Sequence, residues 1–222
     1  LEHRHSFDLE VSRFMQSSRA HTSGLGAFVA PVRAVVAKPH WRGQGGQRRT
    51  AAILASDVVG YSRLMESDEH GTHERLMHLR FEVMEPIIAT YQGRVIKNTG
   101  DGFLAMFDNA GAGLEAARDL QRSVIYAEAA SPAEQRIAFR MGLNVADVIL
   151  EDHDVYGDGV NVAARLQTHA EPNGIVISGL VAEQVGGTLG MQAGDRGQIY
   201  MRNRHEPVRV LGLRLAEAAA FG

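Results

Sequence analysis

Two aspartates lie where apolar runs give way to turns, and this placement suggests chemistry on phosphates. Asp57 follows the apolar run 51–55, and Asp101 lies in the sequence Lys-Asn-Thr-Gly-Asp-Gly at 97–102. If the two runs belong to neighbouring strands, both carboxylates can hold the same hard cations, because Mg²⁺ and Mn²⁺ prefer oxygen ligands. A pair of such ions promotes displacement at phosphorus. Taken singly, Asp57 also fits a helix cap and Asp101 a tight turn.

Four other polar residues are candidates for substrate binding. Asn161 and Arg165 are four residues apart on a predicted helix, so they share one face, and an arginine can donate two hydrogen bonds to one phosphate. Lys97 precedes Asp101 by four positions, and Asp154 ends the acidic stretch 151–154. By spacing alone, an ordinary solvated surface remains the simpler interpretation of all four.

Several other kinds of site do not fit the sequence. His73 and His78 are five residues apart, whereas two zinc ligands on one helical face need a spacing of four. Gly24 and Gly26 lack the third glycine and the preceding strand of a dinucleotide fingerprint, and no Walker-type Gly-Lys-Ser/Thr motif occurs. Because the chain has no cysteine, it can form neither disulfides nor thiolate metal sites, and a cytoplasmic location is expected.

The pattern of apolar residues predicts the elements that must position these side chains. A strand is expected over 50–56, then a helix over 73–91 that bends at Pro86 and is capped by Gly93. The elements expected after it are a hairpin of 94–98 with 103–107, a helix over 113–127, a strand over 137–150, a helix over 159–169, a strand over 175–178, a short helix over 180–185, and a closing antiparallel pair of 198–201 with 207–215. This order predicts an α+β fold of ferredoxin-like type, an antiparallel sheet with helices on one face and extra C-terminal strands.

Length and charge indicate one globular domain with an appendage. The chain has 222 residues, of which 45% are hydrophobic, which suits a single core. Residues 1–56 carry eight Lys and Arg against three acids, although the whole chain has a net charge of −3. We therefore expect residues 1–47 to form a basic, flexible segment and 216–222 a tail. The longest apolar stretch, 24–37, is broken by Pro31 and Arg33, so no membrane segment is predicted.

Three sequence blocks resemble a known family. They are Ala-Ser-Asp-Val-Val-Gly-Tyr-Ser at 55–62, Val-Ile-Lys-Asn-Thr-Gly-Asp-Gly at 95–102, and Asp-Val-Tyr-Gly-Asp-Gly-Val-Asn-Val-Ala-Ala-Arg at 154–165. In residue types, order and separation they resemble the class III nucleotidyl cyclase catalytic domain, particularly that of bacterial adenylate cyclases. The resemblance covers 48–215 and leaves 1–47 outside.

The resemblance implies a role for each residue on the metal and phosphate side of the site. Asp57 and Asp101, with the backbone of Val58, match the ligands of two Mg²⁺ or Mn²⁺ ions per active site. Backbone amides of Val59 and Gly60 match the part of the family's loop that faces the phosphates.

The resemblance also implies how the nucleotide is recognised. Lys97 and Asp154 match the pair that selects adenine, which favours ATP as the substrate. Asn161 matches the residue that orients the ribose, and Arg165 the residue that stabilises charge on the α-phosphate.

A final implication concerns assembly. In the family the metal aspartates and the nucleotide-recognising residues reach one site from opposite subunits, so a head-to-tail homodimer is expected. The phosphate-binding lysine of the family is replaced here, and Arg202 and Arg204 are the nearest cations.

The activity predicted is conversion of ATP to 3′,5′-cyclic AMP and pyrophosphate. The alternative within the same fold is a catalytically silent module that binds nucleotide or dimerises. A ferredoxin-like RNA-binding module would present aromatic residues on its sheet. Phe103, Phe107 and Phe139 are too few and too apolar in context for that, so no nucleic-acid partner is expected.

Overall fold

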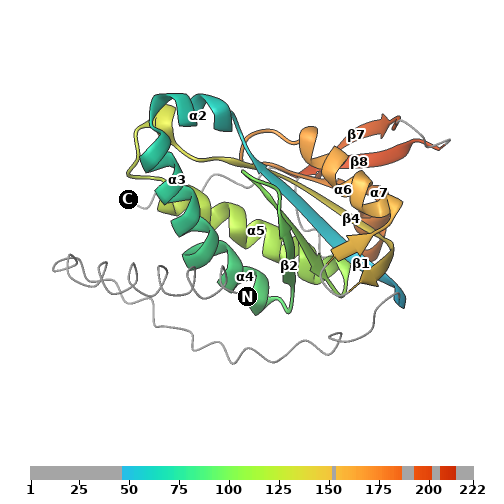
Figure 1. Cartoon of the computed structure of the whole chain (residues 1–222). Helices are drawn as coiled ribbons and strands as arrows, with labels where there is room; N and C mark the ends of the chain where they lie inside the picture. Colours follow the sequence, from blue (N-terminus) through green and yellow to red (C-terminus); the bar gives the residue numbers. More distant parts are fainter. Residues whose placement is uncertain (1–46, 152–153, 187–192, 202–205, 214–222) are drawn as a thin grey trace. The chain divides into compact units, whose positions relative to one another are not determined.

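A mixed sheet of eight strands forms the centre of the domain (Figure 1). The computed structural model describes residues 47–151, 154–186, 193–201 and 206–213. Along the sheet the strand order is β2-β3-β1-β4-β6-β8-β7, and β5 pairs with β4 outside this path. The strands are β1 (Gln47–Val58), β2 (Arg94–Asn98), β3 (Phe103–Phe107), β4 (Phe139–Glu151), β5 (Asp154–Tyr156), β6 (Ile175–Ser178), β7 (Ala193–Ile199) and β8 (Val208–Leu213).

The central strand β1 is buried on both of its faces. It pairs antiparallel with β3 on one side and with β4 over its whole length on the other. Ala52 and Leu54 contribute to the main core, whereas Ala51 and Ile53 contribute to a second cluster on the opposite face. A strand covered on both faces is a near-continuous apolar run, which is why the sequence 51–55 shows little alternation.

Helices cover both faces of the sheet, whereas the sequence analysis placed them on one. The main core joins the sheet to side chains from α2 (Tyr61–Ser67), α3 (Glu69–His78), α4 (Glu85–Thr90), α5 (Ala110–Ala127) and α7 (Gly179–Val185). On the other face α6 (Asp158–Thr168) packs against β4 and β1, and its Ala163 belongs to the second cluster. The α+β class is as predicted. Two details differ from the prediction: α6 covers the second face, and the sheet is not wholly antiparallel, because β4 and β6 pair in parallel.

The predicted helix over 73–91 is interrupted by a π-helix, Leu79–Met84. The amide of Glu85 donates to the carbonyl of Arg80, five residues earlier, which widens the helix by one residue. Pro86 is the second residue of α4 and follows the π-helix directly. Proline has no amide hydrogen, so it cannot donate to a carbonyl of that preceding turn. The left-handed residue after α4 is Gln92 (φ 57), not Gly93.

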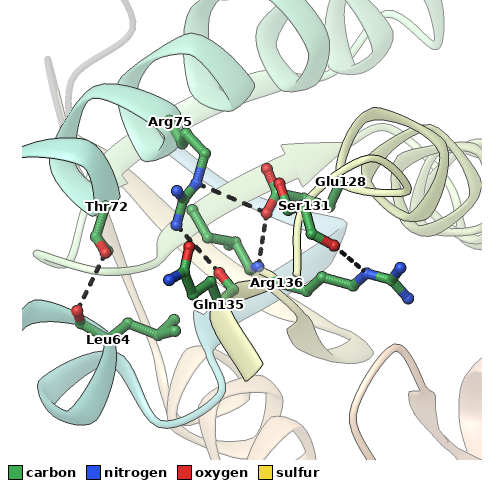
Figure 2. A network of polar contacts seen from close by, with 8 residues as sticks. Leu64, Thr72, Arg75, Glu128, Ser131, Gln135 and Arg136 are labelled. Atoms are coloured by element: carbon green, nitrogen blue, oxygen red, sulfur yellow. Dashed lines mark hydrogen bonds and ion pairs between the residues drawn. The ribbon is translucent and has the colours of Figure 1, made fainter. Parts of the chain in front are cut away.

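A polar network fixes α3 to the loop between α5 and β4 (Figure 2). Arg75 donates to the carbonyl of Gln135 at 3.1 Å and lies 3.8 Å from the Glu128 carboxylate. Glu128, which is 4% exposed, also accepts from the amide of Ile137 at 2.9 Å. A buried carboxylate with these two partners holds the entrance of β4 in place.

Among the described residues, none of the helices has the length and hydrophobicity needed to cross a membrane.

Candidate active site

Asp57, the penultimate residue of β1, lies directly opposite Arg140 of β4. Arg140 donates from Nε to Asp57 Oδ1 at 3.1 Å and from Nη2 to Oδ2 at 2.8 Å. The two side chains are 26% and 30% exposed for Asp57 and Arg140. The register of β1 and β4 places Asp57 and Arg140 opposite each other, so the pairing of the two strands determines this bidentate ion pair. Sequence reasoning did not identify Arg140, since apolar periodicity predicts a strand but not its register.

Asp101 lies in the loop between β2 and β3, and this loop touches the end of β1. A Cβ atom on Gly102 would lie 1.8 Å from the carbonyl oxygen of Ser56 and 2.9 Å from Cα of Asp57. Glycine is therefore required for the two backbones to approach this closely. The loop also contains Gly100 with φ 88, a left-handed conformation that favours glycine. The structure thus brings together the two aspartates that the sequence analysis paired.

Asp101 is affected by the charge of Asp57 and by two nearby cations. Burial raises the pKa of Asp101, and the neighbouring charge of Asp57 raises it further. A hydrogen bond to its own backbone and the cations Arg140 and Arg80 lower the pKa of Asp101. A cation between two adjacent carboxylates offsets the repulsion between their charges.

The donor set fits hard divalent ions better than zinc. The described residues contain no cluster of three or more His, Cys, Asp or Glu side chains able to hold a metal. Two carboxylates with backbone oxygens leave room for phosphate and water ligands, which is how Mg²⁺ is commonly bound. Asp57, Asp101 and the backbone of Val58 are therefore the residues that would hold such ions.

The turn after β1 differs in one respect from the expected phosphate loop. The amide of Val59 donates to the carbonyl of Ala138 at 2.8 Å, so it serves the fold and is not a free donor for phosphate. Gly60 has φ 64 and precedes α2. A Cβ on Gly60 would lie 3.7 Å from Arg63 Nε, which places an exposed cation beside this turn that sequence reasoning missed.

Lys97 and Asp154, although 57 residues apart, contact each other. Lys97 Nζ lies 3.1 Å from Asp154 Oδ1 and 3.2 Å from Oδ2. Asp154 also accepts from the amide of Val155 at 2.8 Å. This backbone hydrogen bond, followed by the contact with Lys97, lowers the pKa of Asp154. An ammonium and a carboxylate held together offer one donor and one acceptor to a ligand edge.

Asn161 and Arg165 are exposed on α6, one turn apart. Neither side chain has a hydrogen-bond or ion-pair partner within the part of the chain that the structure describes. The helix is held close to β4, because a Cβ on Gly142 would lie 2.3 Å from the amide nitrogen of Gln167 and 2.4 Å from the carbonyl of Ala163. Asn144 fixes the start of α6 by donating to the carbonyl of Gly159 at 3.0 Å.

The site residues therefore fall into two groups within one chain. Asp57 and Asp101 form the first, and Lys97, Asp154, Asn161 and Arg165 form the second. No hydrogen bond or ion pair between described residues joins the two groups. Arg202 and Arg204, the expected phosphate-binding cations, lie outside the described residues.

The chain matches the family model described as the adenylate and guanylate cyclase catalytic domain over residues 45–211. It is 45% identical over 164 residues to a protein of Rhizobium meliloti named as an adenylate cyclase. That match covers 74% of this chain and 28% of the relative. An adenylate cyclase of Streptomyces coelicolor is 29% identical over 140 residues, which cover 62% of this chain and 34% of that protein. The chain thus spans about a third or less of the length of these relatives.

Solved structures show the same fold. An adenylate/guanylate cyclase/hydrolase from Silicibacter pomeroyi superimposes with a TM-score of 0.73 at 40% identity, covering 78% of this chain and 100% of that one. The adenylyl cyclase CyaB from P. aeruginosa has a TM-score of 0.69 at 21% identity, covering 79% and 98%. The family match, the shared fold and the paired aspartates agree, and we conclude that this chain belongs to the adenylate and guanylate cyclase catalytic domain family.

Proposed function

We propose that this domain is an adenylate cyclase that converts ATP to 3′,5′-cyclic AMP and pyrophosphate. The ribose 3′-oxygen forms a bond to the α-phosphorus, and the bond from that phosphorus to the oxygen bridging to the β-phosphate breaks. Pyrophosphate leaves with the electron pair, and the 3′-hydroxyl proton passes to Asp57 or to solvent. The observation that carries the proposal is the close approach of Gly102 to the end of β1, which brings Asp101 beside Asp57.

The first group of residues binds the metal ions that contact the triphosphate. Asp57, Asp101 and the backbone of Val58 would hold two Mg²⁺ or Mn²⁺ ions. Such ions lower the pKa of the 3′-hydroxyl and neutralise phosphate charge when they are bound. Arg140, which already donates to Asp57, keeps a positive charge at this position, where it favours an anionic substrate.

The second group recognises the nucleotide. The Lys97 ammonium donates to a ring nitrogen of adenine, and the Asp154 carboxylate accepts from the exocyclic amine. Guanine presents an oxygen where adenine has its amine, so the carboxylate disfavours GTP. The names of the relatives support the same choice of base. Asn161 orients the ribose, and the exposed guanidinium of Arg165 stabilises the charge that develops on the α-phosphate.

A head-to-tail homodimer completes the proposal. Each chain carries both groups of residues, yet no contact described in one chain joins them. A two-fold dimer places the aspartates of one protomer against the nucleotide-recognising group of its partner, and it produces two equivalent sites. We assign the catalytic domain to 48–215 and the triphosphate tail contact to Arg202 or Arg204.

The test is incubation of the purified chain with ATP and Mn²⁺, with cyclic AMP and pyrophosphate measured separately. We expect equal amounts of the two products, and a lower yield of cyclic GMP from GTP. A verified dimer that binds ATP without forming cyclic AMP would instead support the alternative, a silent nucleotide-binding module. If GTP is the better substrate, the assignment of Lys97 and Asp154 to adenine is wrong.

A further inference from the structure

Arg80 is a buried arginine that contacts the loop carrying Asp101. Arg80 is 9% exposed, and it lies in the π-helix that interrupts the long helical segment. Nη2 of Arg80 lies 2.9 Å from the carbonyl oxygen of Gly100 and 3.4 Å from that of Gly102. These two carbonyls flank Asp101 in the sequence. One guanidinium therefore holds the backbone on both sides of a single aspartate.

The π-helix accounts for how Arg80 reaches this loop. Leu79 and Arg80 are consecutive, yet both are buried, and Leu79 belongs to the main core. An α-helix turns its side chains by about 100° per residue, so two buried neighbours need partners on two sides of the helix. The extra residue in the π-turn widens the helix at this point, and such insertions are frequent at functional sites.

Nearby groups partly offset the cost of burying the charge of Arg80. Burial lowers the pKa of Arg80, and the charges of Glu85, Tyr61 and Asp101 oppose this effect. Burial raises the pKa of Glu85, whereas Arg80 lowers it. Apolar residues can often replace a buried ion pair without loss of stability, so the hydrogen bonds of Arg80 to the loop are a candidate reason for an arginine at this position.

We propose that Arg80 is a positioning residue that holds the Asp101 loop against the end of β1, so that the two aspartates share a cation. This inference rests on the proposed function in one respect, because it takes Asp101 as a metal ligand. Arg80 contacts the loop backbone and has no direct role in the reaction. Groups that orient metal ligands typically change metal affinity by about 10- to 100-fold when they are removed.

A purely structural role is the competing explanation, and Arg75 provides a matched control. Arg75 lies on α3, the helix that leads into the π-helix, and like Arg80 it donates to a backbone carbonyl, that of Gln135 at 3.1 Å. Its other contact is the buried Glu128, at 3.8 Å (Figure 2). Removing Arg75 therefore weakens the packing of the same helical segment without touching the loop.

The experiment compares the full chain with Arg80→Met, Arg80→Lys, Arg75→Met and Asp101→Ala. Mn²⁺ affinity is measured by electron paramagnetic resonance without nucleotide, and melting temperature is measured in parallel at the same pH. We expect Arg80→Met to bind Mn²⁺ at least about tenfold more weakly than the wild type, and Arg75→Met to bind it normally despite a lower melting temperature. Arg80→Lys should recover most of the melting temperature but only part of the affinity, because an ammonium lacks the planar fork of donors.

The outcomes separate this inference from the proposed function. Equal Mn²⁺ affinity in Arg80→Met and Arg75→Met, measured on folded protein, would show that Arg80 only stabilises the fold. Binding of Mn²⁺ that Asp101→Ala does not weaken would also overturn the inference. If Asp101 and Arg80 are both needed for Mn²⁺ binding but no cyclic AMP forms, the positioning role stands and the proposed activity fails.

Discussion

Arg140 and Asp57 face each other across β4 and β1 and share two hydrogen bonds, at 3.1 and 2.8 Å. Both oxygens of the Asp57 carboxylate are therefore engaged before any cation arrives. A guanidinium in this position has two effects. It offsets the repulsion between Asp57 and Asp101, and it competes with a divalent ion for the same carboxylate.

We predict that Arg140→Gln lowers the stability of the metal-free protein and increases its response to Mn²⁺. Loss of the paired charge should cost about 1 kcal/mol, because the ion pair is only partly buried. Mn²⁺ should then raise the melting temperature of the variant by more than it raises that of the wild type, since the cation no longer displaces a guanidinium. Arg49→Gln is the control, because Arg49 pairs with Asp108 elsewhere on the sheet. Equal responses to Mn²⁺ in all three proteins would contradict the competition.

A mixture of two inactive variants should recover activity if the site is composite. Asp57→Ala and Arg165→Ala each remove one of the two groups of residues, so each homodimer should be inactive. In a mixed dimer, one site combines the intact aspartates of one protomer with the intact recognition group of its partner. With random exchange, half of the dimers are mixed and each holds one good site, so about a quarter of wild-type activity is expected. The recovered activity is measured as the rate of cyclic AMP formation. If mixed dimers form but are inactive, the site is not shared between protomers.

The contact between Lys97 and Asp154 predicts that their substitutions are not additive. Lys97→Ala leaves a carboxylate without its partner, and Asp154→Ala leaves an ammonium, whereas the double variant leaves neither. The ratio of kcat/KM for ATP to that for GTP should fall about tenfold or more in the double variant. The loss of kcat/KM for ATP in the double variant should be smaller than the two single losses combined. Additive losses would mean that the two residues act on the substrate independently.

The preference for ATP should not depend on pH near neutrality. The pKa of Asp154 is lowered, first by the Val155 amide and then by Lys97, so the carboxylate is ionised in the folded protein. For a carboxyl with a lowered pKa, the stabilising interaction is present above the unfolded pKa and is lost only as pH falls through the folded one. The ATP-to-GTP ratio of kcat/KM should therefore be constant between about pH 6 and 8. A step in that range would indicate that another group selects the base.

The sequence predicted the elements whose signals are local. The bounds of β2, β3 and β6 agree with the prediction. Each contains consecutive apolar residues, and glycines lie beside each strand in the sequence. The strand expected over 198–201 is instead β7, Ala193–Ile199, whose polar and mostly exposed residues give no apolar alternation. The π-helix escaped prediction because one inserted residue changes the apolar spacing too little to be seen in a single sequence.

The site was predictable to the extent that it follows from residue type and motif. The motifs indicated the two aspartates, and the structure brings them together. Arg140 and Arg80 could not be found in this way, since one depends on strand register and the other on a π-turn facing a distant loop. Arg140 contacts Asp57 and Arg80 contacts the loop that carries Asp101. Only the tertiary packing brings these two arginines to the aspartates.

The close approach of Gly102 to β1 leads to a last prediction. A methyl group at position 102 would lie 1.8 Å from the Ser56 carbonyl oxygen, and this atom belongs to backbone that cannot move without breaking the sheet. Gly102→Ala should therefore separate the Asp101 loop from β1, weaken Mn²⁺ binding and lower the melting temperature.

Gly100→Ala is the matched control, because it lies in the same loop with φ 88 but has nothing within 4 Å of a new Cβ. Its cost is conformational strain alone, on the order of 1–2 kcal/mol. We expect Gly100→Ala to keep most of its Mn²⁺ affinity and cyclase activity, whereas Gly102→Ala loses both. If Gly102→Ala binds Mn²⁺ as tightly as Gly100→Ala does, then the approach of the loop to β1 does not determine the spacing of the two aspartates.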